Sequence, residues 1–169
     1  NSFVSTLEFD SSGRILIGGG FTSFDGTGRN RIARLAATGS LDTSFNPGTG
    51  ADAPVRDLVY DSSGKILAVG EFTLFNGTAR NRIVRLNADG SVDVAFNPGT
   101  GANDAIRAIL IQTDGKIVIG GDFTTFNGVT RNRIARLNAD GSLDFTFTPG
   151  AGFDNTVFAL DFDGSQRIL

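Results

Sequence analysis

Three arginine-rich segments of one pattern are the feature of this sequence that could do chemistry. RNRIARL occupies Arg29–Leu35, RNRIVRL occupies Arg80–Leu86, and RNRIARL returns at Arg131–Leu137. So many arginines close together could bind a polyanion, or could pair with carboxylates inside the protein. The net charge of −3 argues against a nucleic-acid partner, because nucleic-acid-binding domains carry a net basic face.

The third arginine of each segment is followed by an aspartate at a constant spacing. If the residues after the segment form a tight turn, Arg85 faces Asp93 across a hairpin. The same count predicts three ion pairs: Arg34–Asp42, Arg85–Asp93 and Arg136–Asp144. Cross-strand pairs of opposite charge stabilise a sheet by roughly 0.2–1 kcal/mol. We therefore predict a structural role for these arginines.

The other two arginines of each segment are predicted to lie elsewhere. The count brings the second arginine beside an aromatic ring, which favours cation–π stacking. These predicted pairs are Arg31–Phe45, Arg82–Phe96 and Arg133–Phe147. The first arginine ends a loop, where it can bond loop carbonyls or meet an acidic ligand. A ligand or partner is therefore expected on the loop face, at Asp25, Arg29, Asn76, Arg80, Asn127 and Arg131.

The residue types that are absent exclude several classes of site. The chain has no histidine and no cysteine, so disulfides, thiol nucleophiles and His/Cys zinc sites are excluded, as is the commonest general base. The segment Asn87–Asp93 resembles part of a calcium loop, but Arg85 stands where the first carboxylate is required. We predict no metal and no cofactor. No apolar run approaches the roughly 18 residues of a membrane span, so no membrane insertion is expected.

One further motif is Asn76-Gly77-Thr78, which is an N-glycosylation acceptor sequence. The corresponding residues elsewhere read Asp-Gly-Thr and Asn-Gly-Val, so the motif does not repeat. A chance match is the favoured interpretation, with a glycan at Asn76 on an exposed loop as the alternative.

An internal repeat organises all of these residues. Gly13, Gly64 and Gly115 are each 51 residues apart, and the arginine segments have the same spacing. The register divides the chain into units 4–54, 55–105 and 106–156, and residues 157–169 begin a fourth unit. We interpret these units as blades 1, 2 and 3 and the first hairpin of an incomplete blade 4.

Each unit carries the signals of short strands and tight turns. In the second unit, Val55–Tyr60 and Lys65–Thr73 flank a turn that ends in glycine, which predicts a hairpin. A loop is predicted at Leu74–Ala79. A second hairpin is predicted from Asn81–Leu86 and Val92–Phe96. Four antiparallel strands per unit are therefore expected.

Strands that are apolar at consecutive positions, such as Ile15–Ile17, indicate sheets covered on both faces. Four-stranded antiparallel sheets of 51 residues, stacked around an axis, make an all-β, β-propeller-type repeat. A β-sandwich or β-solenoid is the alternative.

The repeat also resembles a known family. Asp114-Gly115-Lys116-Ile117, Gly120–Thr124, Arg131–Asp144 and Phe147–Gly150 are similar to the delta-sixty repeat of bacterial proteins, and the resemblance covers essentially the whole chain. It implies a propeller-like fold within large secreted or surface-attached proteins. It carries over no catalytic residue and no cofactor.

We therefore expect a non-enzymatic structural or interaction module of an extracellular or cell-surface protein. Three and a half blades cannot close a ring, so we expect the chain to continue in a longer array or to pair with copies of itself, as a seven-blade ring or as a fibril. The alternative is a carbohydrate-binding propeller that uses its loops to hold glycans. A hydrolase or lyase is a third option, which a non-repeated acid and base in the central channel would support.

Overall fold

The computed structural model describes residues 2–163, 165 and 167–169, and this part of the chain contains strands and turns but no helix. Each repeat contains one three-stranded antiparallel sheet, in which the second strand of the unit lies between the first and the last. Blade 1 consists of β1 (Val4–Phe9), β2 (Ile15–Gly19) and β5 (Ile32–Leu35); blade 2 of β6 (Val55–Tyr60), β7 (Ile66–Gly70) and β10 (Ile83–Leu86); blade 3 of β11 (Ile106–Ile111), β12 (Ile117–Gly121) and β15 (Ile134–Leu137). The fold is thus all-β and propeller-like, as predicted.

The segment predicted as a loop in each unit is instead a small hairpin. The pairs are β3 (Ser23–Phe24) with β4 (Thr27–Gly28), β8 (Leu74–Phe75) with β9 (Thr78–Ala79), and β13 (Thr125–Phe126) with β14 (Val129–Thr130). The turn residues Asn76 and Gly77 both have positive φ, 47° and 71°. Such values are typical of a two-residue type I′ turn, and Asn-Gly is its strongest sequence signal.

The predicted fourth strand is the other difference. In blade 2 it is reduced to a single bridge between Leu86 and Val92. The Asp93 carboxylate accepts a hydrogen bond from the Ala95 amide at 3.0 Å, and the Phe96 amide bonds the Asp93 carbonyl. This local turn ends the ladder, because an aspartate side chain offers the backbone an alternative to sheet pairing. Each blade is therefore three-stranded.

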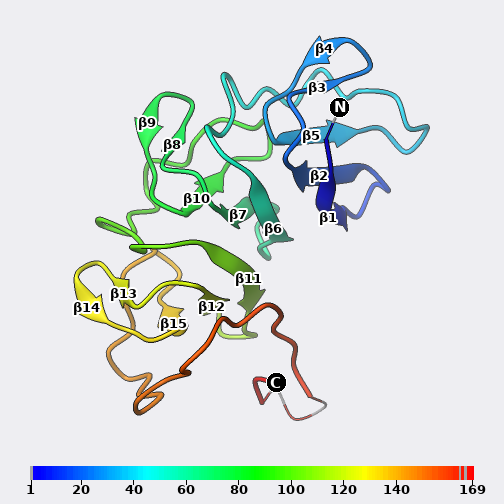
Figure 1. Ribbon diagram of the computed structural model, residues 1–169. Helices are drawn as coiled ribbons and strands as arrows, with labels where there is room; N and C mark the ends of the chain where they lie inside the picture. Colours follow the sequence, from blue (N-terminus) through cyan, green and yellow to red (C-terminus); the bar gives the residue numbers. More distant parts are fainter. Residues whose placement is uncertain (1, 164, 166) are drawn as a thin grey trace.

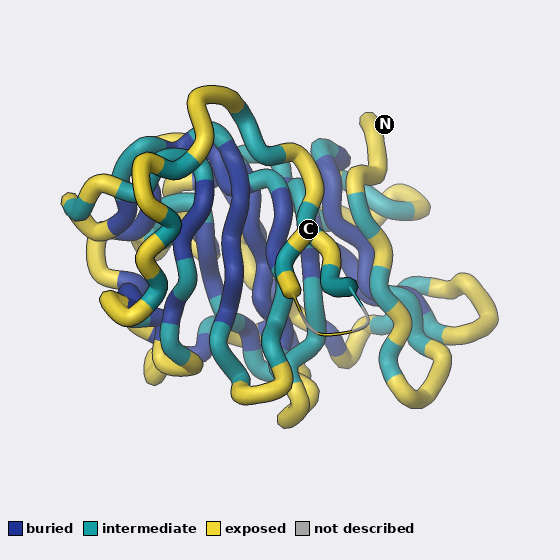
Figure 2. The backbone as a smooth tube through the Cα atoms, turned by 90° about the horizontal axis from the view of Figure 1, so that it is seen from below, coloured by how far each residue is buried: buried dark blue, intermediate teal, exposed yellow. Residues whose placement is uncertain are grey.

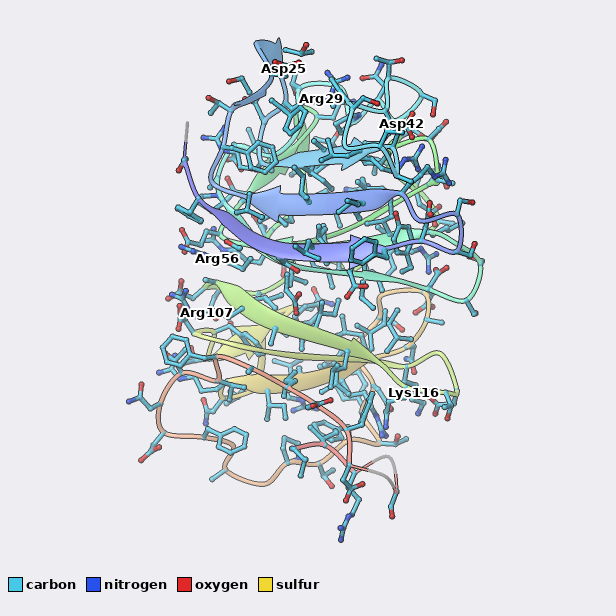
Figure 3. The ribbon with its side chains drawn as sticks, turned by 90° about the vertical axis from the view of Figure 1, so that its right-hand side faces the viewer. Asp25, Arg29, Asp42, Arg56, Arg107 and Lys116 are labelled. Atoms are coloured by element: carbon cyan, nitrogen blue, oxygen red, sulfur yellow. The ribbon has the colours of Figure 1, made fainter. Side chains whose placement is uncertain are left out.

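The three blades stack in chain order. Strand β6 lies between β1 and β11, and the small hairpins lie at the periphery (Figures 1 and 3). Neighbouring residues of one strand face different cores. Leu16 belongs to the core between blades 1 and 2, whereas Ile17 belongs to the cluster on the opposite face of blade 1. Figure 2 shows the result, with buried strands in the middle and exposed turns at both ends.

The start of the fourth unit is less regular than predicted. Residues 157–163 form no strand, and Phe162 and Ile168 make one isolated bridge. The Asp163 amide bonds the Arg167 carbonyl at 2.9 Å, which keeps the two segments together. Residues 164 and 166 of the predicted hairpin lie outside the described residues. The Val157 amide donates to the Gly121 carbonyl at 3.3 Å, so this segment packs on blade 3.

Candidate functional site

The third arginine of each segment is placed against its aspartate by the hairpin that joins them. The Nε atom lies 2.7 Å from the carboxylate oxygen in Arg34–Asp42 and Arg85–Asp93. In Arg136–Asp144 the distance is 2.8 Å. Within each hairpin the aspartate amide also donates to the arginine carbonyl at 2.9 Å. Backbone register and ion pair therefore specify the same hairpin geometry.

The same guanidinium groups reach into the following blade. Arg34 Nη1 donates to the Ala88 carbonyl of blade 2 at 2.6 Å, and Arg85 Nη1 donates to the Ala139 carbonyl of blade 3 at 2.7 Å. Next to them, backbone amides donate to the same turns: Asn46 N to Asp89 O at 2.7 Å and Asn97 N to Asp140 O at 2.8 Å. Each internal junction thus uses one arginine and one amide from one blade, and two turn carbonyls from the next.

The aspartate of each pair binds more than the arginine. Lys65 Nζ lies 2.8 Å from Asp93, and Lys116 Nζ lies 2.7 Å from Asp144. Burial raises the pKa of Asp93, but its bonds from Lys65, the Ala95 amide and Arg85 together lower it to about 2. The pKa of Asp144 is likewise held below its usual range, and the hydrogen bond from Lys116 is the largest cause. The repeat pattern predicted no role for these two lysines.

The predicted aromatic stacking was assigned to the wrong arginine. The guanidinium carbons that lie over Phe45, Phe96 and Phe147 are those of the third arginines, at 5.0, 4.9 and 5.0 Å from the ring centres. The second arginine of each segment has a left-handed backbone, with φ of 69° at Arg82. Strand β10 begins only at Ile83, so strand alternation cannot be counted back through Arg82. Its Nη1 donates instead to the Glu71 carbonyl.

The first arginine of each segment lies at the loop end and is bonded locally. Arg29 Nη1 donates to the Gly28 carbonyl at 2.8 Å, and Arg80 and Arg131 make the equivalent bond at 2.9 Å. Figure 3 shows Arg29 and Asp25 together on the small outer hairpin, apart from Asp42. The guanidinium groups of this face therefore hold their own loops, and the Nε atom of each is buried without a hydrogen-bond partner among the described residues.

The predicted ligand residues Asn76 and Asn127 join the loops of successive blades. Asn76 Oδ1 accepts a hydrogen bond from the Thr49 amide at 3.1 Å, and Asn127 Oδ1 accepts one from the Thr100 amide at the same distance. Asn76 is also the glycosylation candidate, and nothing in these contacts tests that prediction.

A small hollow opens on this loop face between blades 1 and 2. Its volume is about 250 Å³, and Asn30, Thr49, Asp52, Leu74 and Gly77 are among the residues that line it. The side-chain Nδ2 of Asn30 donates to the Thr49 carbonyl at 2.8 Å, so a hydrogen bond holds one wall of the hollow together. Side-chain amides, hydroxyls and a carboxylate are groups that can bond a sugar.

A larger hollow lies at the opposite end, among the tight turns of blades 1 and 2. Its volume is about 350 Å³, and Arg14, Arg34 and Tyr60 line it. The Tyr60 hydroxyl is buried without a hydrogen-bond partner among the described residues. Tyr60 is the only tyrosine of the chain, and the residues at its position in the other units are Phe9 and Ile111. Comparison of the units could have singled it out.

A non-repeated carboxylate lies where the inner strands of the three blades meet. Asp57 on β6 accepts hydrogen bonds from Thr6 Oγ1 on β1 at 3.1 Å and from the Ile109 amide on β11 at 3.0 Å. Burial raises the pKa of Asp57, and burial together with the Asp57 charge raises that of Glu8. Neither carboxylate lines the hollows described above. Asp57 therefore joins three blades at their centre.

The described residues contain no group of three or more side chains of the metal-binding types, and they include no helix that is long and apolar enough to cross a membrane.

Comparison with known proteins places the repeat in a family. The model of a "domain of unknown function (DUF5122) beta-propeller" matches residues 11–45, 62–96 and 112–147, which together make up more than half of the chain. A search of curated protein sequences found no match. Among solved structures, the WD40 beta propeller domain of Doa1 is similar over 98% of this chain and 74% of its own, at 15% identity and a TM-score of 0.42. The chain belongs to the DUF5122 beta-propeller family.

Proposed function

We propose that this chain is a non-enzymatic structural or interaction module, one stretch of a longer blade array or a unit that assembles with copies of itself. The observation that carries the proposal is the junction between blades. The same arginine and amide bond the same two turn carbonyls at both internal junctions. Residues that repeat in every unit thus serve blade-to-blade binding, and such a contact can be extended.

The location is also part of the proposal. Delta-sixty repeats of bacteria occur in large secreted or surface-attached proteins, so an extracellular or cell-surface site follows from that resemblance. A stacked array of blades would serve there as a structural element or fibril, with no membrane insertion.

The test is the mass of the 169-residue chain in solution. Light scattering and sedimentation between about 1 and 100 µM span the range in which weak interfaces populate. We expect the mean mass to rise with concentration. A monomer at all concentrations that melts cooperatively would overturn self-assembly as the function.

A second candidate is carbohydrate binding, which the hollow of about 250 Å³ on the loop face favours because Asn30, Thr49 and Asp52 are among its lining residues. The test is saturable binding on a glycan array, followed by titration of Asp52→Ala against any glycan retained. Asp52 accepts bonds from the Thr73 and Leu74 amides, so loss of binding must be shown to occur without loss of folding. Absence of saturable binding would remove this candidate.

A further inference from the structure

We infer that the hollow among the tight turns of blades 1 and 2, called here the turn-end hollow, is a binding site for a sugar residue, a neutral ligand with several hydroxyl groups. It lies at the opposite end of the blades from the loop face on which the sequence predicts a ligand. The inference does not depend on the structural role proposed above. Its basis is a comparison of the turn-end hollow with the corresponding hollow between blades 2 and 3.

A hollow with the same lining pattern occurs at both internal blade junctions. Lining residues of the two hollows stand 51 positions apart: Asp10 and Asp61, Arg34 and Arg85, Tyr60 and Ile111, Ala88 and Ala139. Each hollow has a blade on either side, so the repeat itself builds it. The volumes are about 350 Å³ between blades 1 and 2 and about 220 Å³ between blades 2 and 3. Ligand pockets run from about 300 to 1,000 Å³, so only the turn-end hollow falls within that range.

Tyr60 gives the turn-end hollow a donor that its counterpart lacks. The Tyr60 hydroxyl is buried and has no hydrogen-bond partner among the described residues. Arg34 lines the same hollow, but a guanidinium group contains only donors and cannot accept a bond from the hydroxyl. Burial raises the pKa of Tyr60, so the hydroxyl keeps its proton at neutral pH. A buried donor without an acceptor is unfavourable, and a ligand oxygen in the hollow would supply the acceptor.

Two more lining residues have polar atoms that the protein does not use. Arg14 bonds Asp10 through Nε at 2.6 Å, whereas its Nη1 lies 3.8 Å from Asp42, which is too far for a hydrogen bond. Asp61 accepts the bonds of its own turn through Oδ1. Its Oδ2 accepts no hydrogen bond among the described residues. The hollow therefore offers N–H donors from Arg14 and a carboxylate acceptor from Asp61.

The charges of the lining favour a neutral ligand. Positive and negative charges balance, because the charged lining residues are Arg14, Arg34, Asp10 and Asp61. A carboxylate ligand would be repelled by Asp61, and an ammonium ligand by Arg14. A hydroxyl group can accept a bond from Tyr60 or Arg14 and donate one to Asp61. Adjacent hydroxyls on one sugar ring match all three groups.

The hollow between blades 2 and 3 lacks these groups. Ile111 stands at the position of Tyr60 and has no hydroxyl, and Gln112 stands at the position of Asp61. The position of Arg14 is taken by Lys65, whose Nζ is bonded to Asp93 at 2.8 Å. We therefore expect one bound sugar per chain.

Tyrosine fluorescence provides the test, because Tyr60 is the only tyrosine and the chain has no tryptophan. The probes are D-glucose, D-galactose, D-mannose and N-acetyl-D-glucosamine, each titrated to millimolar concentration into the 169-residue chain. We expect at least one of them to change the emission saturably, with one site per chain by calorimetry. Tyr60→Phe keeps the ring and should weaken that binding by roughly threefold to tenfold in calorimetry, as expected for the loss of one hydrogen bond. Ile111→Val, in the other hollow, is the matched control and should leave the affinity unchanged.

The stability of Tyr60→Phe separates a ligand contact from a structural one. Because the hydroxyl has no partner in the free protein, its removal should leave the urea midpoint unchanged or raise it. A lower midpoint would show that the hydroxyl is bonded within the chain, and would overturn the inference.

The other outcomes also separate this inference from the proposed functions. No saturable binding of any probe would overturn it, as would an unchanged affinity in Tyr60→Phe. Binding that is lost in Asp52→Ala and kept in Tyr60→Phe would locate the sugar in the loop-face hollow, which overturns this inference and supports the second candidate function. Self-association is measured separately by light scattering, so its failure would leave the sugar site standing.

Discussion

The two ends of one arginine segment behave differently. In RNRIVRL the third arginine, Arg85, is held by Asp93 on its own blade and by a carbonyl of the next blade, and its ring partner covers the guanidinium. The side chain of the first arginine, Arg80, bonds only the carbonyl of its neighbour Ala79 among the described residues. Of two arginines five residues apart, Arg85 thus stabilises the junction between blades, whereas Arg80 stabilises only its own loop. Their contribution depends on how many fixed partners surround them.

The largest effect is expected for the most buried of these arginines. Arg34→Ala removes the bonds to Asp42, Ser44 and the Ala88 carbonyl, and leaves the partly buried Asp42 carboxylate with less compensation. We expect a loss of about 3 kcal/mol in the free energy of unfolding. Urea unfolding followed by circular dichroism measures it, with Arg29→Ala as the matched control. Equal midpoints for the two variants would contradict the buried role.

The next effect concerns the acidic partner. Asp93→Ala leaves Arg85 and Lys65 without their shared carboxylate and removes the acceptor of the Ala95 amide. The expected loss is about 1–3 kcal/mol. The same urea measurement applies, and Arg80→Ala serves as the comparison. If both substitutions lowered the midpoint equally, the distinction between the two ends of the segment would be lost.

Acid should weaken the ion pairs between the third arginines and their aspartates. The folded-state pKa of Asp93 is about 2, below its ordinary value of 3.8, and the pKa of Asp42 is also lowered. A lowered folded-state pKa stabilises the fold fully above pH ~4, and the stabilisation is lost as the pH falls towards 2. The urea midpoint should therefore drop across this interval. The drop should be smaller in Asp93→Asn, and an unchanged drop in that variant would argue against the ion pair.

The smallest effect is expected at the loop end. Arg80→Ala removes one bond to the adjacent carbonyl of an exposed loop, and should cost less than about 1 kcal/mol. The measurement is the shift in melting temperature by calorimetry. A loss comparable to that of Arg34→Ala would show that the loop hairpins contribute to the fold as much as the blade junctions do.

Much of this architecture could be predicted from the sequence. The repeat spacing gave the number of sheets, consecutive apolar residues indicated burial on both faces, and a turn count paired Arg34 with Asp42. These features depend on residues close together in the chain, and the same residue pattern occurs in all three units. The small hairpin was also encoded in Asn76-Gly77, although that signal was read as a loop.

Other features were decided by tertiary structure alone. The left-handed backbone of Arg82 shifted the aromatic stacking to Arg85, and the turn built by Asp93 ended the predicted fourth strand. The Arg34 contact with Ala88 and the joining of three blades by Asp57 connect residues about one repeat apart. A single unit does not contain such contacts, because they exist only once neighbouring blades pack. The sequence by itself determined the blades, and their packing determined which arginines bind them together.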